Sequence, residues 1–357
     1  MPVTDGHFTK KMLPPIDLFC RVIDNLGDIG VCWRLARQLV AEHGAAVRLI
    51  VDDLGAFHVI APDIVPHATS PQTLLGVQVV PWSMAETLTP SAVVIEAFAC
   101  DPPAAYVRAM AARAAKPVWL NLEYLSAEAW VDDVHGRPSP HPRLPLTKHF
   151  FCPGFTEASG GVIRERSLAP PSPVRRSPSP LRLFAFTYPA APVRALAAAF
   201  ASAGQPLTVT TAAPLAERDT VWAHATPVAQ TEFDGLLAHF DLLVVRGEDS
   251  FVRAQWAARP LLWHIYPTAD GAHRIKLDAW LDRYVAGLPA VVARDYRALS
   301  HAFIRGDTTA AAYGALVTHL PALCEHASRW RHQLAQQSDL ATRLLAFIAS
   351  ATAQKVS

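Results

Sequence analysis

A repeated alternation of short apolar runs with helical stretches is the feature that most constrains the fold of this chain. The first run, IDLFCRVI, begins at Ile16 and is followed by the turn DNLGDIG, the helical stretch VCWRLARQLVAEHG and a second run, VRLIVDD. Residues 92–98 and 117–125 form further runs of strand length, on either side of the Ala-rich helical stretch PAAYVRAMAARAA. Strands joined by helices in this way pair in parallel and are covered on both faces. The first half therefore predicts a doubly wound α/β domain.

The same alternation restarts in the second half, after a break. Residues 159–180 read SGGVIRERSLAPPSPVRRSPSP, and their Pro, Ser and Arg content sustains neither a helix nor a central strand. The patterns that follow are LRLFAFTY, PVRALAAAFASAG, PLTVTTA, DLLVVRGEDS, FVRAQWAARP and LLWHIYP. A chain of 357 residues also exceeds what one core usually holds. We predict a Rossmann-like domain over 1–158, a linker over 159–180, a second Rossmann-like domain over 181–335 that faces the first across a cleft, and a C-terminal helix over 336–357.

Composition and charge exclude several classes of protein. With 51% hydrophobic and 18% charged residues the chain can bury a core, and a net charge of +1 provides no field that would recruit nucleic acid. No run reaches the ~18 apolar residues of a membrane helix, and residues 1–13 lack the apolar core of a signal peptide. The cysteines are odd in number, widely spread and without a C-x-x-C pair, which is typical of reduced thiols. They are Cys20, Cys32, Cys100, Cys152 and Cys324. We expect a cytoplasmic protein that binds neither nucleic acid nor membranes.

The loop after the first strand carries both glycines and carboxylates. Gly27 and Gly30 imitate a dinucleotide-binding turn, but that fingerprint needs three glycines. Asp24 and Asp28 would also repel a pyrophosphate. The structural alternative for Asp28 is a helix N-cap. Because the loop follows the carboxyl end of its strand, where α/β sheets bind ligands, either carboxylate can act as a base, and the residues alone do not distinguish the two.

A second polar loop, RGEDS at 246–250, follows directly on the strand pattern DLLVV. A nucleotide-sugar donor needs a cation or amides for its diphosphate, a carboxylate for sugar hydroxyls, and small polar groups near a helix N-terminus. The loop offers all of these. Upstream, Phe233 can stack on a nucleobase and Gln230 can recognise its edge. The structural alternatives are a surface turn that caps the following helix and, for Phe233, a core position.

Three long segments resemble the protein-arginine rhamnosyltransferases of bacterial translation elongation factor P, the EarP family. The segments are FCRVIDNLGDIGVCWRLARQL, NLEYLSAEAWVDDVHGRPSPHPRLPLTKHFFCPGF and VVRGEDSFVRAQWAARPLLWHIYPT. The resemblance implies an α/β fold of the GT-B glycosyltransferase type, in which a final helix often crosses back to the first domain. It also implies an inverting enzyme that moves L-rhamnose from dTDP-β-L-rhamnose to an arginine of elongation factor P (EF-P), without a metal or cofactor. The modified factor relieves ribosome stalling at polyproline stretches.

The resemblance further implies roles for individual residues. Asp28 corresponds to the general base, Asp24 to its acidic neighbour, and Glu248 to the catalytic-site glutamate of the second domain. Thr187 stands where the family often has a cysteine. The implied donor-binding residues, with Phe233 stacking on thymine and Tyr266 as a further candidate, are Phe186, Tyr188, Gln230, Phe233, Arg246, Glu248, Asp249 and Ser250.

Two other functions are compatible with the sequence. One is a GT-B transferase that uses another nucleotide sugar and a small or lipid acceptor, which would need a basic or amphipathic membrane-facing stretch. The other is a non-catalytic module that binds dTDP and responds to it. Only the EF-P function predicts a deoxyhexose attached to an arginine of EF-P.

Overall fold

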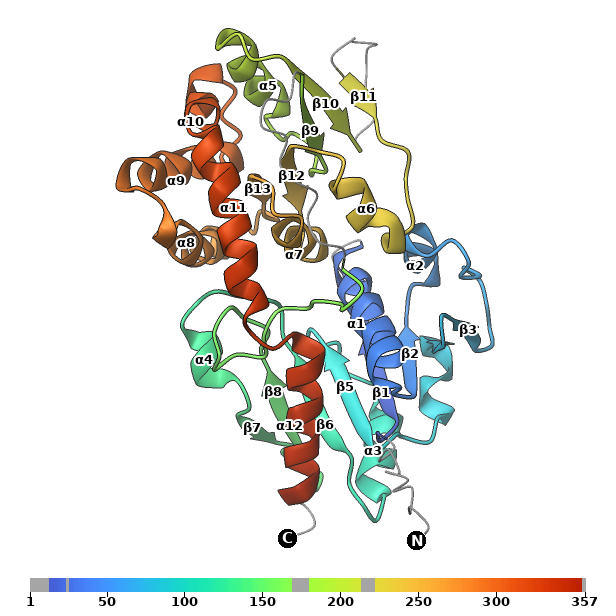
Figure 1. Cartoon of the computed structure of the whole chain (residues 1–357). Coiled ribbons are helices and arrows are strands. Elements are labelled where there is room, and N and C mark those ends of the chain that lie inside the picture. Colours follow the sequence, from blue (N-terminus) through green and yellow to red (C-terminus); the bar gives the residue numbers. More distant parts are fainter. Residues whose placement is uncertain (1–12, 24–25, 169–179, 213–221, 355–357) are drawn as a thin grey trace, which may run out of the picture.

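Two sheets of mainly parallel strands form the frame of the molecule (Figure 1). The computed structural model describes residues 13–23, 26–168, 180–212 and 222–354. Each sheet is built from the strand–helix units that the apolar runs predict, so the prediction of two Rossmann-like α/β domains is confirmed.

The first sheet has the strand order β3-β4-β2-β1-β5-β6-β8-β7. Its edge strands β3 and β7 are antiparallel to their neighbours, and the other strands are parallel. The strands are β1 Ile16–Cys20, β2 Val47–Val51, β3 Gln72–Leu74, β4 Val77–Pro81, β5 Val93–Ala97, β6 Val118–Leu122, β7 Pro138–Pro140 and β8 Thr147–Phe151. The helices are α1 Gly27–His43, α2 Leu54–Ile60, α3 Ala104–Ala112, α4 Trp130–Val134 and the 3-10 helix η1 Trp82–Thr87.

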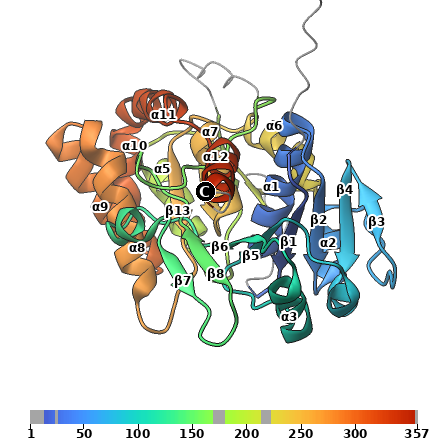
Figure 2. The same cartoon turned by 90° about the horizontal axis from the view of Figure 1, so that it is seen from below.

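Both faces of the first sheet are buried, as a doubly wound sheet requires. Along β1, Leu18 and Cys20 belong to the larger core, on the side of α1, whereas Phe19 packs with Tyr106 of α3 in a separate core. Figure 2 shows α1 on one side of this sheet and α3 on the other. The alternation follows from the two-residue period of a strand, so every residue of β1 has a buried position.

The second sheet is parallel throughout, with the order β11-β10-β9-β12-β13. Its strands are β9 Leu181–Ala185, β10 Leu207–Thr211, β11 Trp222–His224, β12 Leu242–Arg246 and β13 Leu261–His264. The α-helices are α5 Val193–Ser202, α6 Phe233–Leu237, α7 Asp249–Trp256, α8 Ala272–Tyr284, α9 Ala290–Ile304, α10 Gly314–Thr318 and α11 Leu320–Ala335. The 3-10 helices are η2 Gln230–Glu232, η3 Val285–Gly287 and η4 Ala310–Tyr313.

The last helix, α12 (Leu340–Gln354), lies against the first sheet although α11 belongs to the second domain (Figure 1). The Leu340 N–H donates to the carbonyl of Val162 at 3.1 Å, and the ring centroids of Phe347 and Phe151 lie 6.1 Å apart. The polypeptide therefore passes between the domains a second time before it ends.

The segment 159–168, the described part of the predicted linker, contains no helix or strand. It is nevertheless packed, because Val162 and Ile163 are buried in the main core. Residues 169–179 of the same prediction lie outside the described residues. The domain boundaries at 158, 180 and 335 stay a prediction.

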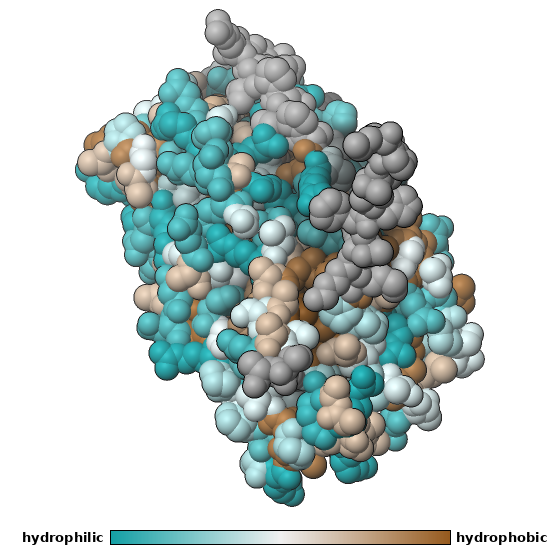
Figure 3. Space-filling model, turned by 60° about the horizontal axis from the view of Figure 1, so that its bottom comes forward, coloured by the Kyte–Doolittle hydropathy of each residue, from teal (hydrophilic) through white to brown (hydrophobic). Residues whose placement is uncertain are grey.

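The outer surface is mainly hydrophilic on the face shown in Figure 3, where hydrophobic atoms gather near the middle of the view. The larger hydrophobic core extends through both domains. Across the described part of the chain, no helix has the length and apolar character needed to cross a membrane.

Candidate active site

Two cavities lie where the carboxyl ends of strands from both sheets meet. The first has a volume of about 260 Å³ and is lined mainly by the second domain, with Gly30 and its neighbours of α1 as one wall. The second has a volume of about 360 Å³ and is lined by both domains. Gly27, Gly247 and Glu248 line both cavities, so the two spaces adjoin at these residues.

The first cavity brings together the residues predicted to bind the donor. Aromatic side chains form part of its wall: the rings of Phe186 and Phe233 lie 5.7 Å apart in an edge-to-face arrangement. The guanidinium carbon of Arg246 lies 4.6 Å from the ring centroid of Phe186 and 5.0 Å from that of Tyr188. Each residue of the predicted set lines this cavity, namely Phe186, Tyr188, Gln230, Phe233, Arg246, Glu248, Asp249 and Ser250. Their roles in donor binding stay a prediction.

The turn between β12 and α7 gives the RGEDS loop its shape. Gly247 has φ 62°, a left-handed conformation that strains residues with a side chain, and the Ser250 hydroxyl donates to the carbonyl of Arg246. Helix α7 begins at Asp249 without a side-chain cap. The alternative of a surface capping turn is therefore wrong, since Ser250 is buried and the carboxylate of Asp249 binds the first domain.

Asp28 lies in the first turn of α1 and is buried, with 1% of its surface exposed. Its Oδ1 accepts a hydrogen bond from the Tyr124 hydroxyl at 2.9 Å, and its Oδ2 accepts one from the Ile23 N–H at 2.8 Å. The N-cap of α1 is Leu26, with no side-chain hydrogen bond, so the capping alternative for Asp28 is wrong. Asp24, the other candidate base, lies outside the described residues.

Gly30 of α1 serves close packing between the domains. A Cβ on Gly30 would lie 3.3 Å from Nε2 of Gln230 and 3.6 Å from the Cβ of Asp249. Asp52 and Asp53 follow the second strand, where a dinucleotide site places its ribose-binding acid, but both have protein partners: Asp53 caps α2, and Asp52 accepts from the Val22 N–H at 2.9 Å. The contacts of Gly30 account for a glycine at this position without a dinucleotide.

The second cavity contains side chains that the sequence analysis did not select. The rings of Phe98 and Tyr124 are stacked, with centroids 4.1 Å apart, and Nζ of Lys276 lies 5.6 Å from the Tyr124 ring. Asp28, Glu128 and Glu248 contribute carboxylates to the same lining. Phe98 follows β5 and Tyr124 follows β6. Their position just after buried strands could have identified them from the sequence as candidate site residues.

The loop after β5 is held in an uncommon backbone conformation. Phe98, Ala99 and Asp101 have φ values of 57°, 52° and 48°, which side-chain-bearing residues rarely adopt. The Phe98 N–H donates to the carbonyl of Leu122 at 2.7 Å, and the Ala99 N–H donates to Oδ1 of Asn121 at 2.9 Å. Strained backbone held by specific hydrogen bonds is common at functional sites.

Glu248 lies at the junction of the two cavities. Its Oε2 accepts a hydrogen bond from the Leu125 N–H at 2.9 Å. Burial raises the pKa of Glu248 to about 7, while Lys276 and the Leu125 N–H oppose this shift. A carboxyl group that titrates near neutral pH therefore stands between the two spaces.

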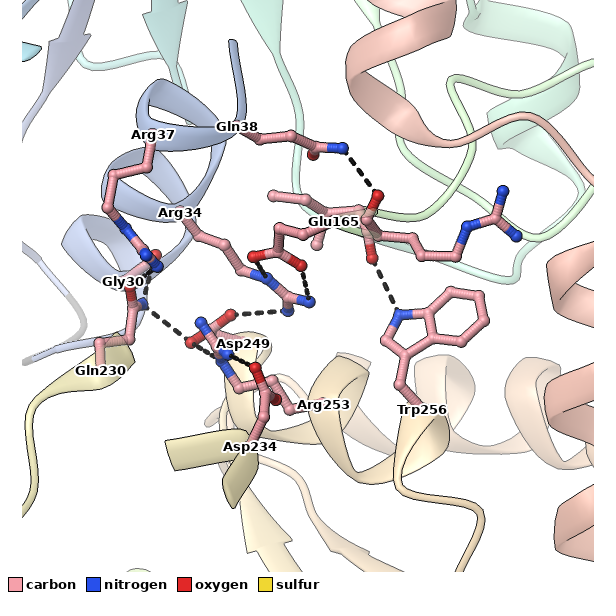
Figure 4. A network of polar contacts seen from close by, with 12 residues as sticks. Gly30, Arg34, Arg37, Gln38, Glu165, Gln230, Asp234, Asp249, Arg253 and Trp256 are labelled. Carbon is pink, nitrogen blue, oxygen red and sulfur yellow. Dashed lines mark hydrogen bonds and ion pairs between the residues drawn. The ribbon is translucent and has the colours of Figure 1, made fainter. Parts of the chain in front are cut away.

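Asp249 joins the first cavity to the first domain (Figure 4). Its Oδ2 accepts hydrogen bonds from Arg253 and from Gln230, both at 2.9 Å, and its Oδ1 accepts one from Arg34 of α1 at 3.1 Å. The Gln230 amide also donates to the carbonyl of Gly30 at 2.7 Å. Both amide hydrogens of Gln230 thus bind protein acceptors, and its Oε1 accepts a hydrogen bond from Arg37 at 3.2 Å. The nucleobase contact predicted for this residue stays a prediction.

A search of the described residues for metal sites finds no group of three or more His, Cys, Asp or Glu side chains that could hold an ion. The polar groups at the site are carboxylates, tyrosine hydroxyls and basic side chains, together with the N-terminus of α7. Such groups can bind a phosphate, orient a guanidinium and accept a proton.

Comparison with known proteins identifies the family. A family model described as "Elongation-Factor P (EF-P) rhamnosyltransferase EarP" matches residues 16–221 and 194–349. The chain belongs to the EarP family. A protein-arginine rhamnosyltransferase of Pseudomonas putida (strain KT2440) is 43% identical, over 93% of this chain and 97% of the relative.

Solved structures agree with this family and its architecture. A structure from work on EarP-mediated arginine glycosylation of translation elongation factor EF-P has a TM-score of 0.62 and 31% identity, over 94% of this chain and 99% of that chain. Spinosyn rhamnosyltransferase SpnG, complexed with thymidine diphosphate, has a TM-score of 0.54 at 10% identity, over 92% of this chain and 98% of that chain, and shares the fold alone. The GT-B fold and the resemblance to EarP are confirmed.

Proposed function

We propose that this protein transfers L-rhamnose from dTDP-β-L-rhamnose to an arginine side chain of EF-P, with inversion and without a metal ion. The observation that carries the proposal is the junction of two chemically different cavities at Glu248. One is lined by aromatic rings, Arg246 and the start of α7, and the other contains Asp28. A group-transfer enzyme needs this adjacency of a donor site and a base.

The first cavity has the chemistry of a nucleoside diphosphate sugar site. Phe186 and Phe233 offer apolar ring surfaces for thymine, and the N-terminus of α7 offers backbone N–H groups for phosphate. The guanidinium of Arg246 supplies positive charge beside them. Charge that develops on the departing dTDP can be stabilised by these groups, so the mechanism requires no divalent ion.

The second cavity suits the guanidinium of an acceptor arginine. The Phe98 and Tyr124 rings can pack against its plane, and carboxylates at Asp28, Glu128 and Glu248 match its charge. In the proposed step Asp28 accepts a proton from a guanidinium nitrogen as that nitrogen bonds to the anomeric carbon. The bond to dTDP breaks at the same time, and this single displacement inverts the anomeric configuration.

The acceptor also suggests a cellular place and role. EF-P acts in translation, so we propose that the reaction occurs in the cytoplasm and prepares the factor to relieve polyproline stalling. No nucleic acid or membrane partner enters the proposed reaction.

Mass spectrometry of intact EF-P after incubation with the enzyme and dTDP-β-L-rhamnose tests the proposal. We expect an increment of one deoxyhexose, located on arginine by fragmentation, unchanged by EDTA, and NMR of the product should show an α linkage. dTDP-glucose in place of the rhamnose donor tests the other nucleotide-sugar function. Binding of dTDP without any increment on EF-P would instead support the non-catalytic module.

A further inference from the structure

Arg34 is a fully buried cation that connects three separated parts of the chain (Figure 4). Its Nε and Nη2 donate to the two carboxylate oxygens of Glu165, both at 2.7 Å, and its Nη1 donates to Oδ1 of Asp249 at 3.1 Å. Arg34 belongs to α1, Glu165 to the segment that leaves the first domain, and Asp249 to the start of α7. The two parallel hydrogen bonds to Glu165 fix the plane of the guanidinium. Its Nη1 is then directed at Asp249, in the loop that begins α7.

The charges around Arg34 are balanced within the domain junction. Burial disfavours the charged form of Arg34, but the carboxylates of Glu165 and Asp249 outweigh it and raise the pKa of the guanidinium. Burial likewise opposes ionisation of Glu165, yet Arg34 lowers the pKa of Glu165 to about 2. Both groups are therefore charged at neutral pH, and the contact is a persistent ion pair.

The second domain holds Asp249 without help from Arg34. Arg253, four residues along α7, binds Oδ2 of Asp249 at 2.9 Å, and Gln230 binds the same oxygen at 2.9 Å. The side chain of Arg253 is itself buried, and its Nη1 pairs with Asp234. Removal of Arg34 would therefore leave the donor loop supported inside its own domain.

The helix that carries Arg34 also carries the proposed base. Asp28 lies six residues before Arg34 in α1, about 9 Å along a helix axis. Because a helix is rigid along its length, the contacts of Arg34 with Glu165 and Asp249 fix the position of Asp28 relative to the loop that begins α7. We propose that Arg34 is a positioning residue that holds the base-bearing helix in register with the donor-binding loop. This inference rests on the proposed function, because it concerns the geometry of the same reaction.

The test separates turnover from donor binding. For Arg34→Gln we expect kcat for EF-P rhamnosylation to fall about 100-fold, the effect of a misplacement of about 1 Å. The Kd for dTDP, measured by isothermal titration calorimetry, should stay close to that of the wild type. Arg34→Lys keeps the positive charge but cannot form the two parallel hydrogen bonds to Glu165. It should therefore recover part of kcat.

Matched variants distinguish positioning from general stability. Arg48→Gln removes another pair with a buried carboxylate, that of Asp17 at the start of β1, and should lower the melting temperature while leaving kcat unchanged. Arg253→Gln removes a partner of Asp249 from within the second domain and should raise the Kd for dTDP. Glu165→Gln loosens the anchor but keeps the cation, and should lower kcat less than Arg34→Gln does.

Each result of these experiments bears on either the positioning role of Arg34 or the proposed function. Wild-type kcat in both Arg34→Gln and Glu165→Gln, or a loss of kcat that only follows a loss of dTDP affinity, would overturn the positioning role. If Arg34→Gln does not fold, Arg34→Lys and Glu165→Gln decide by the same two measurements. Absence of transfer by the wild type would instead overturn the proposed function.

Discussion

The carboxylate of Glu248 accepts a hydrogen bond from the backbone N–H of Leu125 at 2.9 Å, across the junction of the two domains. Leu125 follows directly on Tyr124, whose hydroxyl binds Asp28. A single short stretch after β6 therefore contacts both Asp28 and Glu248. Because burial raises the pKa of Glu248 to about 7, its charge changes within the physiological range.

The pH dependence of the reaction should report Glu248. We expect kcat/KM for EF-P to rise with pH through about 7, because the ionised carboxylate attracts a guanidinium and the protonated form does not. The break in kcat should lie at a lower pH, since a bound guanidinium favours the ionised carboxylate. Initial rates measured between about pH 5.5 and 8.5 check both profiles. A break at the same pH in Glu248→Gln would assign it to another group.

The same residue should make the fold less stable as pH rises. The folded-state pKa of about 7 exceeds the ordinary glutamate pKa of 4.5, so the folded chain retains a proton that the unfolded chain releases. This contribution is fully present below pH 4.5 and is lost as the pH rises through about 7. Glu248→Gln should therefore increase the free energy of unfolding at pH 8 by about 2–3 kcal/mol, and by much less near pH 5. Urea unfolding at the two pH values measures this change in the free energy of unfolding. Glu157→Gln, at an exposed position, is the control, and its effect should be the same at both pH values.

Substitution of Asp28 should separate chemistry from donor binding. Asp28→Asn preserves the shape of the side chain but removes its capacity to take a proton, so kcat should fall by about 10²–10⁴-fold. Affinity for dTDP should be nearly unchanged, because Asp28 lines the second cavity and not the first. Asp249→Asn, at a residue that lines the first cavity, should weaken dTDP binding. Near-normal turnover by Asp28→Asn would exclude it as the base.

The Tyr124 hydroxyl should matter through its hydrogen bond to Asp28. Tyr124→Phe removes a donor to a buried carboxylate, and such a bond contributes about 1.5–3 kcal/mol. We expect kcat to decrease by about 10-fold with dTDP binding unaffected. Tyr106→Phe is the matched control, because it removes a hydroxyl donor to Asp17 on the opposite face of the sheet. Equal losses in the two variants would point to stability rather than to the base.

Gly30 should tolerate a side chain poorly although it lies inside a helix. Alanine normally stabilises a helix interior by up to about 1 kcal/mol relative to glycine. At Gly30, however, the new Cβ would press on the Gln230 amide at 3.3 Å, so we expect weaker dTDP binding and little gain in stability. Gly235→Ala in α6, where no heavy atom lies within 4 Å of the added Cβ, should be stabilising and leave binding unchanged. Calorimetry and thermal unfolding of both variants provide the comparison.

The sequence predicts the α/β frame well because the long apolar strands have a local cause. The runs at β1, β5, β9 and β12 are mainly apolar on both faces, and the helices between them have a helical period. Strands and helices of this kind can therefore be recognised from neighbouring residues alone. The sequence also places Asp28 and Arg246 at the carboxyl edges of their sheets, because Asp28 lies in the helix that follows β1 and Arg246 ends β12. Local rules misplaced the start of α1, where Leu26 and not Asp28 occupies the cap.

The junction between the domains could not be predicted in this way. Arg34 and Glu165 are 131 residues apart, and Arg34 and Asp249 are 215 apart, so no local pattern links them. In a helical pattern Arg34 resembles an exposed cation, yet it is fully buried, with partners in the segment 159–168 and in the second domain. The rings of Phe98 and Tyr124 in the second cavity meet for a similar reason, because the pairing of β5 with β6 brings separate loops together.

The return of α12 to the first sheet sets an order for events during synthesis. Leu344 and Ile348 of α12 belong to the same buried core as Leu120 of β6, so they complete a face of the domain that is made first. A ribosome has translated the whole second domain before these side chains emerge. The nascent first domain therefore keeps an uncovered apolar face until α12 leaves the exit tunnel, and deletion of the codons for α12 would damage the first domain, which is translated much earlier.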